Sequence, residues 1–355
     1  MMRANAALPL RVLVVDDSVF NRRSIGEILA QSPEIEVVGK AADGEEALRL
    51  VSTLKPDCIT LDLEMPRMDG FTFLRILMTK MPTPVIVVSS YSQKENVFKA
   101  LELGALDFVA KPERFSDPDL AGIRELLVSK VLLARSVRLG SPMPAARALQ
   151  AAPAAPVVAP VQKQLVPPKN VIAVASSTGG PSALMEIFTR FPTNYRSALV
   201  IAQHMPDKFT RTFADRLSRR GALKVSEAQD QDVVSEGTGF VCPGRHCMEL
   251  EVSARGTMKL KVTPPGERDR YVPSADRLLT SVANGLGRRA VGVILTGMGD
   301  DGVEGARRII EAGGMVIAES EESAVVYGMP GAAVRAGVAT QSLPLSEIGD
   351  LLAKL

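Results

Sequence analysis

The sequence of 355 residues lacks tryptophan, has few histidines and cysteines, and has no excess of charge of either sign. Its 42 Lys and Arg residues against 40 Asp and Glu leave a net charge of +2, without the basic excess that nucleic-acid binding usually needs. Three cysteines cannot form a disulfide framework, which is typical of a reducing compartment. The apolar N-terminus is interrupted by Asp16 and Asp17, and no run approaches the ~18 apolar residues of a membrane span. We therefore expect a cytoplasmic protein with no nucleic-acid partner and no direct membrane insertion.

Two segments of the chain alternate short runs rich in Val and Ile with stretches whose apolar residues recur every three or four positions. The first segment, residues 10–135, contains candidate strands at 11–15, 35–39, 58–61, 84–88 and 106–110. The second, residues 169–355, contains apolar runs at 171–175, 198–203, 290–296 and 314–320, and an alternating stretch at 257–263. This alternation predicts two doubly wound α/β domains. The first is expected around a five-stranded parallel sheet, and the second to be mostly parallel with an antiparallel excursion around 239–263.

Residues 136–168 differ from both segments. They are dominated by Ala, Pro and Val and show almost no periodicity. Such a stretch cannot bury enough apolar surface to order itself, so we expect a semi-extended linker between the two domains.

Polar residues follow the candidate strands of the first segment. Asp16 and Asp17 end the first strand, Asp62 ends the third, Ser89 ends the fourth, and Lys111 follows the fifth. The carboxyl ends of parallel strands meet in one crevice, where three carboxylates repel each other unless a cation such as Mg²⁺ lies among them. Together with a hydroxyl and an ammonium they suit an Asp that accepts a phosphoryl group. Singly, each is explained as a helix cap or a solvated charge.

The same residues resemble the bacterial response-regulator receiver family. The stretches VVDDS (14–18), LDLEMPRMDG (61–70), VVSS (87–90) and FVAKP (108–112) stand in that family's order, and the match covers about residues 10–130. The resemblance implies Asp62 as the phosphoacceptor, and Asp16, Asp17 and Asp62 as the Mg²⁺ ligands. It implies Ser89 as the switch hydroxyl, Lys111 as the phosphate partner and Phe108 as the switch aromatic. It also implies a histidine kinase as phosphodonor.

A candidate nucleophile follows the first strand of the second segment. Ala175 to Gly179 fit a relaxed G-x-S-x-G turn, in which small neighbours allow a sharp turn from strand to helix that exposes the central hydroxyl, here Ser177. The same turn could bind a phosphate at the helix N-terminus. His204 directly follows the strand 198–203, where a neutral imidazole can accept the proton of that hydroxyl.

A carboxylate at a third strand end would complete this set. The run 290–296 leads into Asp300 and Asp301 among glycines. We therefore expect Ser177, His204 and Asp301 to form a hydrolytic triad, in a chain order different from those of α/β-hydrolases, chymotrypsin and subtilisin. Each residue alone is also explained as a helix cap or a packed core residue.

Residues 169–355 resemble the catalytic domain of the chemotaxis protein-glutamate methylesterases. The stretches that carry the resemblance are ASSTGGP (175–181), IAQHMP (201–206), CPGRHCMEL (242–250), VPSADRL (272–278) and LTGMGDDG (295–302). It implies Ser177 as nucleophile, His204 as general base and acid, Asp301 as the group that orients His204, and Met298 and Thr178 as backbone oxyanion donors. The family usually has Gly-Ala before the nucleophile, where this chain has Ala175-Ser176. Ser176 therefore remains a rival hydroxyl, and Asp300 a rival to Asp301.

The resemblance also implies the reaction. The expected substrate is a glutamate γ-methyl ester on the cytoplasmic part of methyl-accepting chemoreceptors, hydrolysed through an acyl-enzyme with release of methanol. Deamidation of glutamine passes through the same tetrahedral oxyanion, which makes it a second expected reaction of this site. We expect no metal or cofactor at this site, and Mg²⁺ only at the phosphorylation site.

Two other features of the second segment carry weaker hypotheses. Cys242, His246 and Cys247 suggest zinc but lack a fourth ligand, so a packed loop is favoured. The charged run 267–271 is typical of a solvated surface and could also line a substrate groove. Two rival functions remain: a catalytically idle binding module attached to the receiver, and a dinucleotide-binding oxidoreductase, for which 175–181 lacks the G-x-G-x-x-G spacing.

Overall fold

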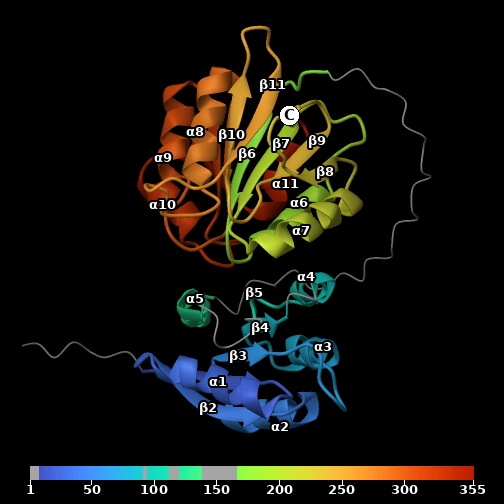
Figure 1. The fold of residues 1–355 in the computed structure, drawn as a ribbon, viewed down its shortest axis with the longest axis vertical. Helices are drawn as coiled ribbons and strands as arrows, with labels where there is room; N and C mark the ends of the chain where they lie inside the picture. Colours follow the sequence, from blue (N-terminus) through green and yellow to red (C-terminus); the bar gives the residue numbers. More distant parts are fainter. Residues whose placement is uncertain (1–7, 91–93, 112–119, 138–165) are drawn as a thin grey trace, which may run out of the picture. The chain divides into compact units, whose positions relative to one another are not determined.

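The chain folds into two compact units, each of which contains a parallel sheet (Figure 1). The computed structural model describes residues 8–90, 94–111, 120–137 and 166–355. The N-terminal unit is Met1–Arg147 and the C-terminal unit is Ala148–Leu355. Most of the predicted linker, 136–168, lies outside the described residues. None of the helices described combines the length and the apolar character that a membrane span requires.

The N-terminal unit has a five-stranded sheet in the order β2-β1-β3-β4-β5, and every neighbouring pair is parallel. Its strands are β1 (Leu10–Val15), β2 (Ile35–Ala41), β3 (Cys58–Leu61), β4 (Val85–Ser89) and β5 (Asp107–Ala110). Its helices are α1 (Val19–Ala30), α2 (Gly44–Leu54), α3 (Gly70–Lys80), α4 (Lys94–Glu102) and α5 (Leu120–Leu132), followed by the 3₁₀ turn η2 (Leu133–Ser136). The predicted doubly wound fold is confirmed.

Polar caps begin three helices of this unit. The side chains of Ser18, Asp43 and Asp69 each accept a backbone N–H from the first turn of the helix that follows. Ser18, not Asp17, therefore caps α1, so the interpretation of Asp17 as a helix cap was wrong. The central strands β3 and β4 are buried along their whole length, which explains their continuous apolar runs.

The C-terminal unit has a seven-stranded sheet in the order β14-β13-β12-β6-β7-β9-β8, and its neighbouring strands all pair in parallel. Its strands are β6 (Val171–Ser176), β7 (Ala198–Gln203), β8 (Lys224–Glu227), β9 (Thr238–Val241), β12 (Ala290–Ile294), β13 (Met315–Glu319) and β14 (Gln341–Leu343). A separate antiparallel hairpin consists of β10 (Cys247–Val252) and β11 (Met258–Thr263).

Helices cover both faces of this sheet. In Figure 1, α8 (Ala275–Leu286), α9 (Val303–Glu311) and α10 (Met329–Arg335) lie on one side. On the other side lie α6 (Gly180–Phe188), α7 (Asp207–Arg220) and α11 (Leu345–Leu352). The short 3₁₀ turn η3 (Gly287–Arg289) connects α8 to β12.

The antiparallel excursion predicted around 239–263 is smaller than expected. β9 belongs to the parallel sheet, where it pairs with β7 and β8, and the antiparallel part is confined to the hairpin β10-β11. The strands β8 and β14 escaped prediction. Both are short edge strands with few buried residues, so they leave little periodic signal in the sequence.

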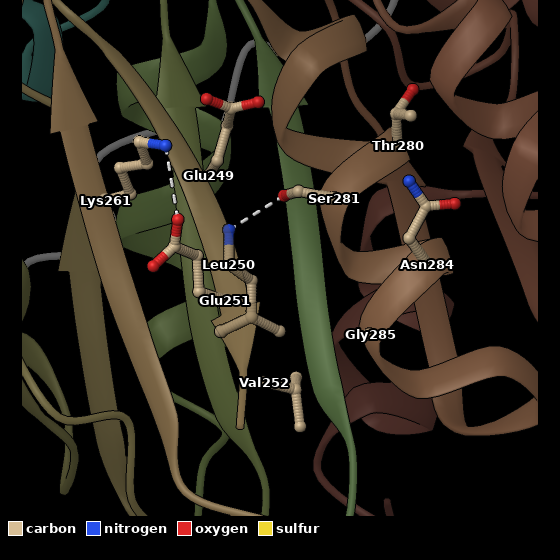
Figure 2. Close-up of a pocket in the computed structure, with 9 residues that line it drawn as sticks. All are labelled: Glu249, Leu250, Glu251, Val252, Lys261, Thr280, Ser281, Asn284 and Gly285. Carbon is tan, nitrogen blue, oxygen red and sulfur yellow. Dashed lines mark hydrogen bonds and ion pairs between the residues drawn. The ribbon is translucent and has the colours of Figure 1, made fainter. Parts of the chain in front are cut away.

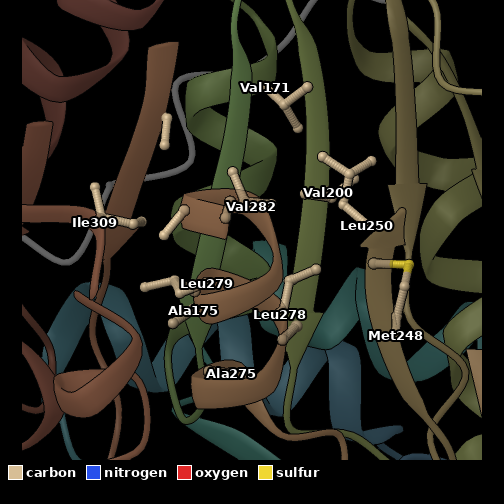
Figure 3. Packing of buried hydrophobic residues seen from close by; sticks show 14 of the residues in the cluster. Val171, Ala175, Val200, Met248, Leu250, Ala275, Leu278, Leu279, Val282 and Ile309 are labelled. Atoms are coloured by element: carbon tan, nitrogen blue, oxygen red, sulfur yellow. The ribbon is translucent and has the colours of Figure 1, made fainter. Parts of the chain in front are cut away.

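Helix α8 packs in the hydrophobic core of the C-terminal unit, and its N-terminus lies near the carboxyl ends of the sheet strands. Its residues Leu278, Leu279 and Val282 are fully buried against small side chains of the sheet, including Ala175 (Figure 3). Each buried Leu or Val of this kind contributes roughly 1.5–3 kcal/mol. The packing fixes the N-terminus of α8, which the Ser274 side chain caps by accepting the N–H of Arg277. That N-terminus is the part of the helix that reaches the candidate site.

Candidate functional site

The carboxylates predicted to bind Mg²⁺ lie together at the carboxyl ends of β1 and β3. Asp16, Asp17 and Asp62 each offer one oxygen, and these oxygens all lie within 4.8 Å of one another. Asp16 and Asp62 are buried, while Asp17 is exposed. Carboxylate oxygens are the hard ligands that Mg²⁺ prefers, so the residues present fit that ion.

Lys111 neutralises part of this charge. Its ammonium Nζ lies 2.5 Å from Asp62 Oδ2 and 2.8 Å from Asp16 Oδ2. Burial raises the pKa of the Asp62 carboxyl against the lowering effect of Lys111, and Asp16 adds to the rise. For Lys111, burial lowers the pKa, but attraction to Asp62 and Asp16 outweighs it and the pKa is raised. Lys111 therefore stays a cation beside a carboxylate that is costly to keep charged.

The predicted switch residues lie on the next two strands. Ser89 ends β4 and is fully buried, and its carbonyl accepts the N–H of Lys111 at 2.8 Å. Phe108, on β5, is a buried core ring in edge contact with Phe98, with 6.4 Å between ring centroids. Lys130 lies over the Phe108 ring and donates to its carbonyl. The fold thus brings Ser89 and Lys111 to one edge of the sheet and places Phe108 just inside it.

The candidate nucleophile and base follow neighbouring strands of the C-terminal unit. β6 and β7 are paired so that Ser176 lies opposite Gln203, and Ser177 and His204 come next on the two strands. The His204 N–H donates to the Ser176 carbonyl at 3.0 Å, and Gln203 Nε2 donates to the Ser177 carbonyl at 2.9 Å. The backbone register therefore brings Ser177 and His204 to the same edge of the sheet.

The two rival serines differ in burial and bonding. Ser176 is fully buried, and its hydroxyl donates to Gln203 Oε1 at 2.7 Å. Ser177 is partly exposed at the start of the turn into α6. Ser177 is thus the more accessible of the two residues, whereas the Ser176 hydroxyl is enclosed and already occupied as a donor.

The two rival aspartates also differ in burial and bonding, but here the favoured candidate is the buried one. Asp301 is 1% exposed, and its Oδ2 lies 2.8 Å from His204 Nε2. It also accepts the N–H groups of Ala275 and Asp276, the first two residues of α8, at 2.8 and 3.0 Å. The positive end of the helix dipole thus supports its negative charge. Asp300 has a half-exposed side chain that accepts the hydroxyl of Tyr271 at 3.0 Å.

The loop after β12 lies against Ser177. The Ser177 N–H donates to the Thr296 carbonyl at 3.1 Å, and the Thr296 hydroxyl donates to the Thr178 carbonyl at 2.9 Å. Gly297 packs so closely that a Cβ there would lie 2.7 Å from Ser177 Cβ. Met298, with an exposed side chain, is the next residue of the loop, while Thr178 is buried. This loop and the turn at Ser177 are the two segments expected to supply oxyanion donors.

Sequence reasoning missed a buried carboxyl behind this loop. Glu319, at the end of β13, is 1% exposed and accepts the Thr296 N–H at 2.8 Å and the Ser323 hydroxyl at 3.0 Å. Burial raises its pKa to about 7, against the lowering effect of these two hydrogen bonds. A lone Glu after an apolar strand signals a polar strand end, but the sequence does not reveal its partners.

Cys242 and Cys247 are not grouped with His246 at metal-ligand spacing among the described residues. Cys242 and Cys247 are buried, burial raises the pKa of both thiols, and Cys242 Sγ contacts the carbonyl of His246 at 3.4 Å. Across the described ranges, the group of side chains with metal-ligand spacing is the carboxylate set of the N-terminal unit. The packed-loop interpretation therefore fits the structure.

A polar cavity of about 310 Å³ lies between the hairpin β10-β11 and α8 (Figure 2). An ion pair between Lys261 and Glu251, at 3.3 Å, lies on one wall. On another, Ser281 accepts the N–H of Leu250 at 2.8 Å. Its lining includes none of Ser177, His204 and Asp301. This cavity is therefore separate from the site at the strand ends.

Comparison with known proteins gives consistent matches for both units. Residues 172–352 match the family model of the CheB methylesterase, and residues 12–120 match that of the response regulator receiver domain. A protein-glutamate methylesterase/protein-glutamine glutaminase of Myxococcus xanthus is 47% identical, over 98% of this chain and 97% of its own. One from Pyrococcus abyssi is 40% identical, over 97% and 93%.

A solved structure is similar to the C-terminal unit. The CheB methylesterase catalytic domain of Thermotoga maritima is 34% identical with a TM-score of 0.50, and the match covers 52% of this chain and 97% of that one. The similarity therefore extends from the sequence to the arrangement of the seven-stranded unit.

Proposed function

The chain belongs to the CheB methylesterase family and carries a response regulator receiver domain, and on that basis we propose that Ser177, His204 and Asp301 form its hydrolytic triad. The chain is a carboxylic ester hydrolase of the protein-glutamate methylesterase type. Its proposed substrates are glutamate γ-methyl esters, and glutamine side chains, on the cytoplasmic domains of chemoreceptors. The proposed boundaries are 10–135 for the receiver, 136–168 for the linker and 169–355 for the catalytic domain.

One observation is the main support for the proposed triad. The buried Asp301 carboxylate lies 2.8 Å from Nε2 of His204, and His204 follows the strand paired with the one that Ser177 follows. A carboxylate accepts a hydrogen bond, so it favours the tautomer with the proton on Nε2. The lone pair of the neutral ring is then on Nδ1. We assign Nδ1 as the atom that takes the Ser177 proton.

The chemistry follows the ordinary course of acyl transfer. The Ser177 oxygen attacks the ester carbon as its proton moves to His204, and the negative charge passes to the carbonyl oxygen. Backbone N–H groups of Thr178 and Met298 are proposed to stabilise this oxyanion. The C–O bond to methoxide then breaks as His204 returns the proton, which releases methanol. Water attacks the acyl-enzyme by the same proton transfers and yields glutamate; for glutamine the leaving group is ammonia.

The N-terminal unit is proposed to control this reaction through phosphorylation of Asp62 by a histidine kinase. Asp16, Asp17 and Asp62 would hold Mg²⁺, which supplies charge neutralisation for the transferred phosphoryl group. Lys111 and Ser89 are proposed to bind phosphoryl oxygens, with Phe108 as the packed ring that responds to the change. Phosphorylation adds charge that both partners can pair, and this biases the unit toward a second conformation.

The test is release of methanol from methylated receptor membranes by the full chain, with and without a small phosphodonor and Mg²⁺. We expect release in both cases and faster release with the phosphodonor. No methanol release under either condition would favour the alternative of a catalytically idle binding module. Loss of release in Ser177→Ala, with a normal rate in Ser176→Ala, tests the assignment of the nucleophile.

A further inference from the structure

A tyrosine stacks on the candidate base. The rings of Tyr271 and His204 are nearly parallel, with 6° between their planes and 5.3 Å between their centroids. This is an offset stack, the arrangement that aromatic pairs prefer. Tyr271 belongs to the segment between β11 and α8, the charged run for which a substrate-lining role was one hypothesis.

The hydrogen bond to Asp301 does not fix the imidazole ring by itself. It holds one ring atom, Nε2, in place, and the ring can still tilt about that contact while the bond persists. A flat ring against one face of His204 opposes this tilt. Stacking and hydrogen bonding therefore restrain different motions of the same side chain.

Tyr271 is itself anchored to the loop that carries Asp301. Its hydroxyl donates to Asp300 Oδ1 at 3.0 Å, and partial burial together with this carboxylate raises the pKa of the hydroxyl, so it stays a donor. Gly299, at φ 92°, makes room for the contact, because a Cβ there would lie 2.6 Å from the Tyr271 hydroxyl oxygen. Arg270 completes the cluster. Its Cζ lies 5.5 Å from the Tyr271 ring centroid, and its Nη1 lies 3.7 Å from Asp300 Oδ2.

We propose that Tyr271 and Asp300 are positioning residues, which hold the His204 ring in the orientation that serves both Asp301 and Ser177. Two consecutive aspartates then have separate duties. Asp301 binds the histidine at its edge, and Asp300 binds the tyrosine that covers its face. The proposal rests on the proposed role of His204 as base.

The test uses the full chain and compares four variants in the methanol-release assay. Tyr271→Ala removes the stack, and we expect kcat to fall about tenfold with KM within about twofold, because misplacement of a catalytic group lowers the rate more than it weakens binding. Tyr271→Phe keeps the ring and should restore most of the rate, within about threefold of the wild type. Asp300→Ala should fall by a similar factor of about three, whereas Asp300→Asn, which keeps the acceptor oxygen, should match the wild type.

A spectroscopic readout follows the ring directly. The chain has only 2 histidines, so ¹⁵N-histidine labelling gives two sets of ring signals, and His204→Gln assigns them. We expect the His204 signals to report one tautomer in the wild type and in Tyr271→Phe, and to broaden in Tyr271→Ala. Should Tyr271→Ala fail to fold, the Asp300 pair gives the same comparison from an exposed position.

Two results would overturn the proposal. One is wild-type kcat and unchanged His204 signals in Tyr271→Ala and Asp300→Ala. The other is a raised KM at unchanged kcat, which would make Tyr271 a substrate contact. Failure of the proposed role of His204 as base looks different. His204→Gln would then keep its rate of methanol release, whatever the Tyr271 variants do.

Discussion

The two units place their key carboxylates at the carboxyl ends of parallel strands, but they neutralise them in opposite ways. Asp62 lies beside the Lys111 side chain, a cation, and beside two further carboxylates that fit a metal ion. Asp301 is held by two backbone N–H groups of α8 and by His204. The partners of Asp62 are side chains, and this fits the proposal that Asp62 gains and loses a phosphoryl group. Two of the partners of Asp301 are backbone groups of the fold, and this fits its proposed role in a triad that is unchanged after each turnover.

The largest expected effect tests whether catalysis at the proposed site of the C-terminal unit depends on one hydroxyl. Ser177→Ala removes the proposed nucleophile, and kcat for methanol release should fall by on the order of 10⁶. The matched control is Ser176→Ala, which removes the enclosed hydroxyl bonded to Gln203. It should cost about 1 kcal/mol of stability and leave the rate near that of the wild type. An inactive Ser176→Ala beside an active Ser177→Ala would shift the nucleophile by one residue.

The next effect tests whether Asp301 acts through its fixed position. Asp301→Asn keeps the shape, but both oxygens of Asp301 accept N–H groups, so one acceptor becomes a donor. Because Asp301 is proposed to select the His204 tautomer, kcat should fall by about 10⁴. Asp300→Asn is the control of equal size at the neighbouring position and should retain its activity. Equal losses in the two variants, measured by methanol release, would mean that the assay reports loss of charge near His204 instead of a specific contact.

The carboxylate site around Asp62 should give a smaller effect on the rate of methanol release, visible only with a phosphodonor. We expect about tenfold activation of the full chain by a small phosphodonor and Mg²⁺, equivalent to about 1.4 kcal/mol, and none in Asp62→Asn. Asp57→Asn is the matched control, because Asp57 precedes β3 while Asp62 follows it. Activation that persists in Asp62→Asn would place the phosphoacceptor elsewhere.

The last effect concerns stability and not activity, and its site is Glu319, a buried carboxyl held by hydrogen bonds from Thr296 and Ser323. Its pKa rises from 4.5 to about 7 on folding. The stability it contributes is therefore complete below pH 4.5 and is lost as the pH rises through 7. Glu319→Gln stays neutral, so its free energy of unfolding should exceed that of the wild type at pH 8, by on the order of 3 kcal/mol, and approach it near pH 5. Denaturant unfolding of both proteins at the two pH values checks this, and a constant difference would contradict it.

The sequence predicted the fold class of both units because parallel strands buried on both faces leave continuous apolar runs. It also predicted that Ser177 and His204 directly follow strands, and the structure has them immediately after β6 and β7. It could not separate Ser176 from Ser177, or Asp300 from Asp301, since neighbouring residues of one type differ in burial and bonding partners and not in pattern. Tyr271 lies in a segment without periodicity, so its stack on His204 depends on a tertiary contact that no local spacing encodes.

The position of β6 at the centre of its sheet has a consequence for hydrogen exchange. The amide hydrogens of Ser177 and His204 are bonded to the carbonyls of Thr296 and Ser176, so their exchange with solvent requires separation of central strands and should approach the rate of global unfolding. Tyr271 lies in a loop before α8, which can open by local fluctuation. We therefore expect the frame of the site to be long-lived and the segment with the ring that covers His204 to exchange faster. The lifetime of the fully ordered site should then depend on this loop and not on the sheet.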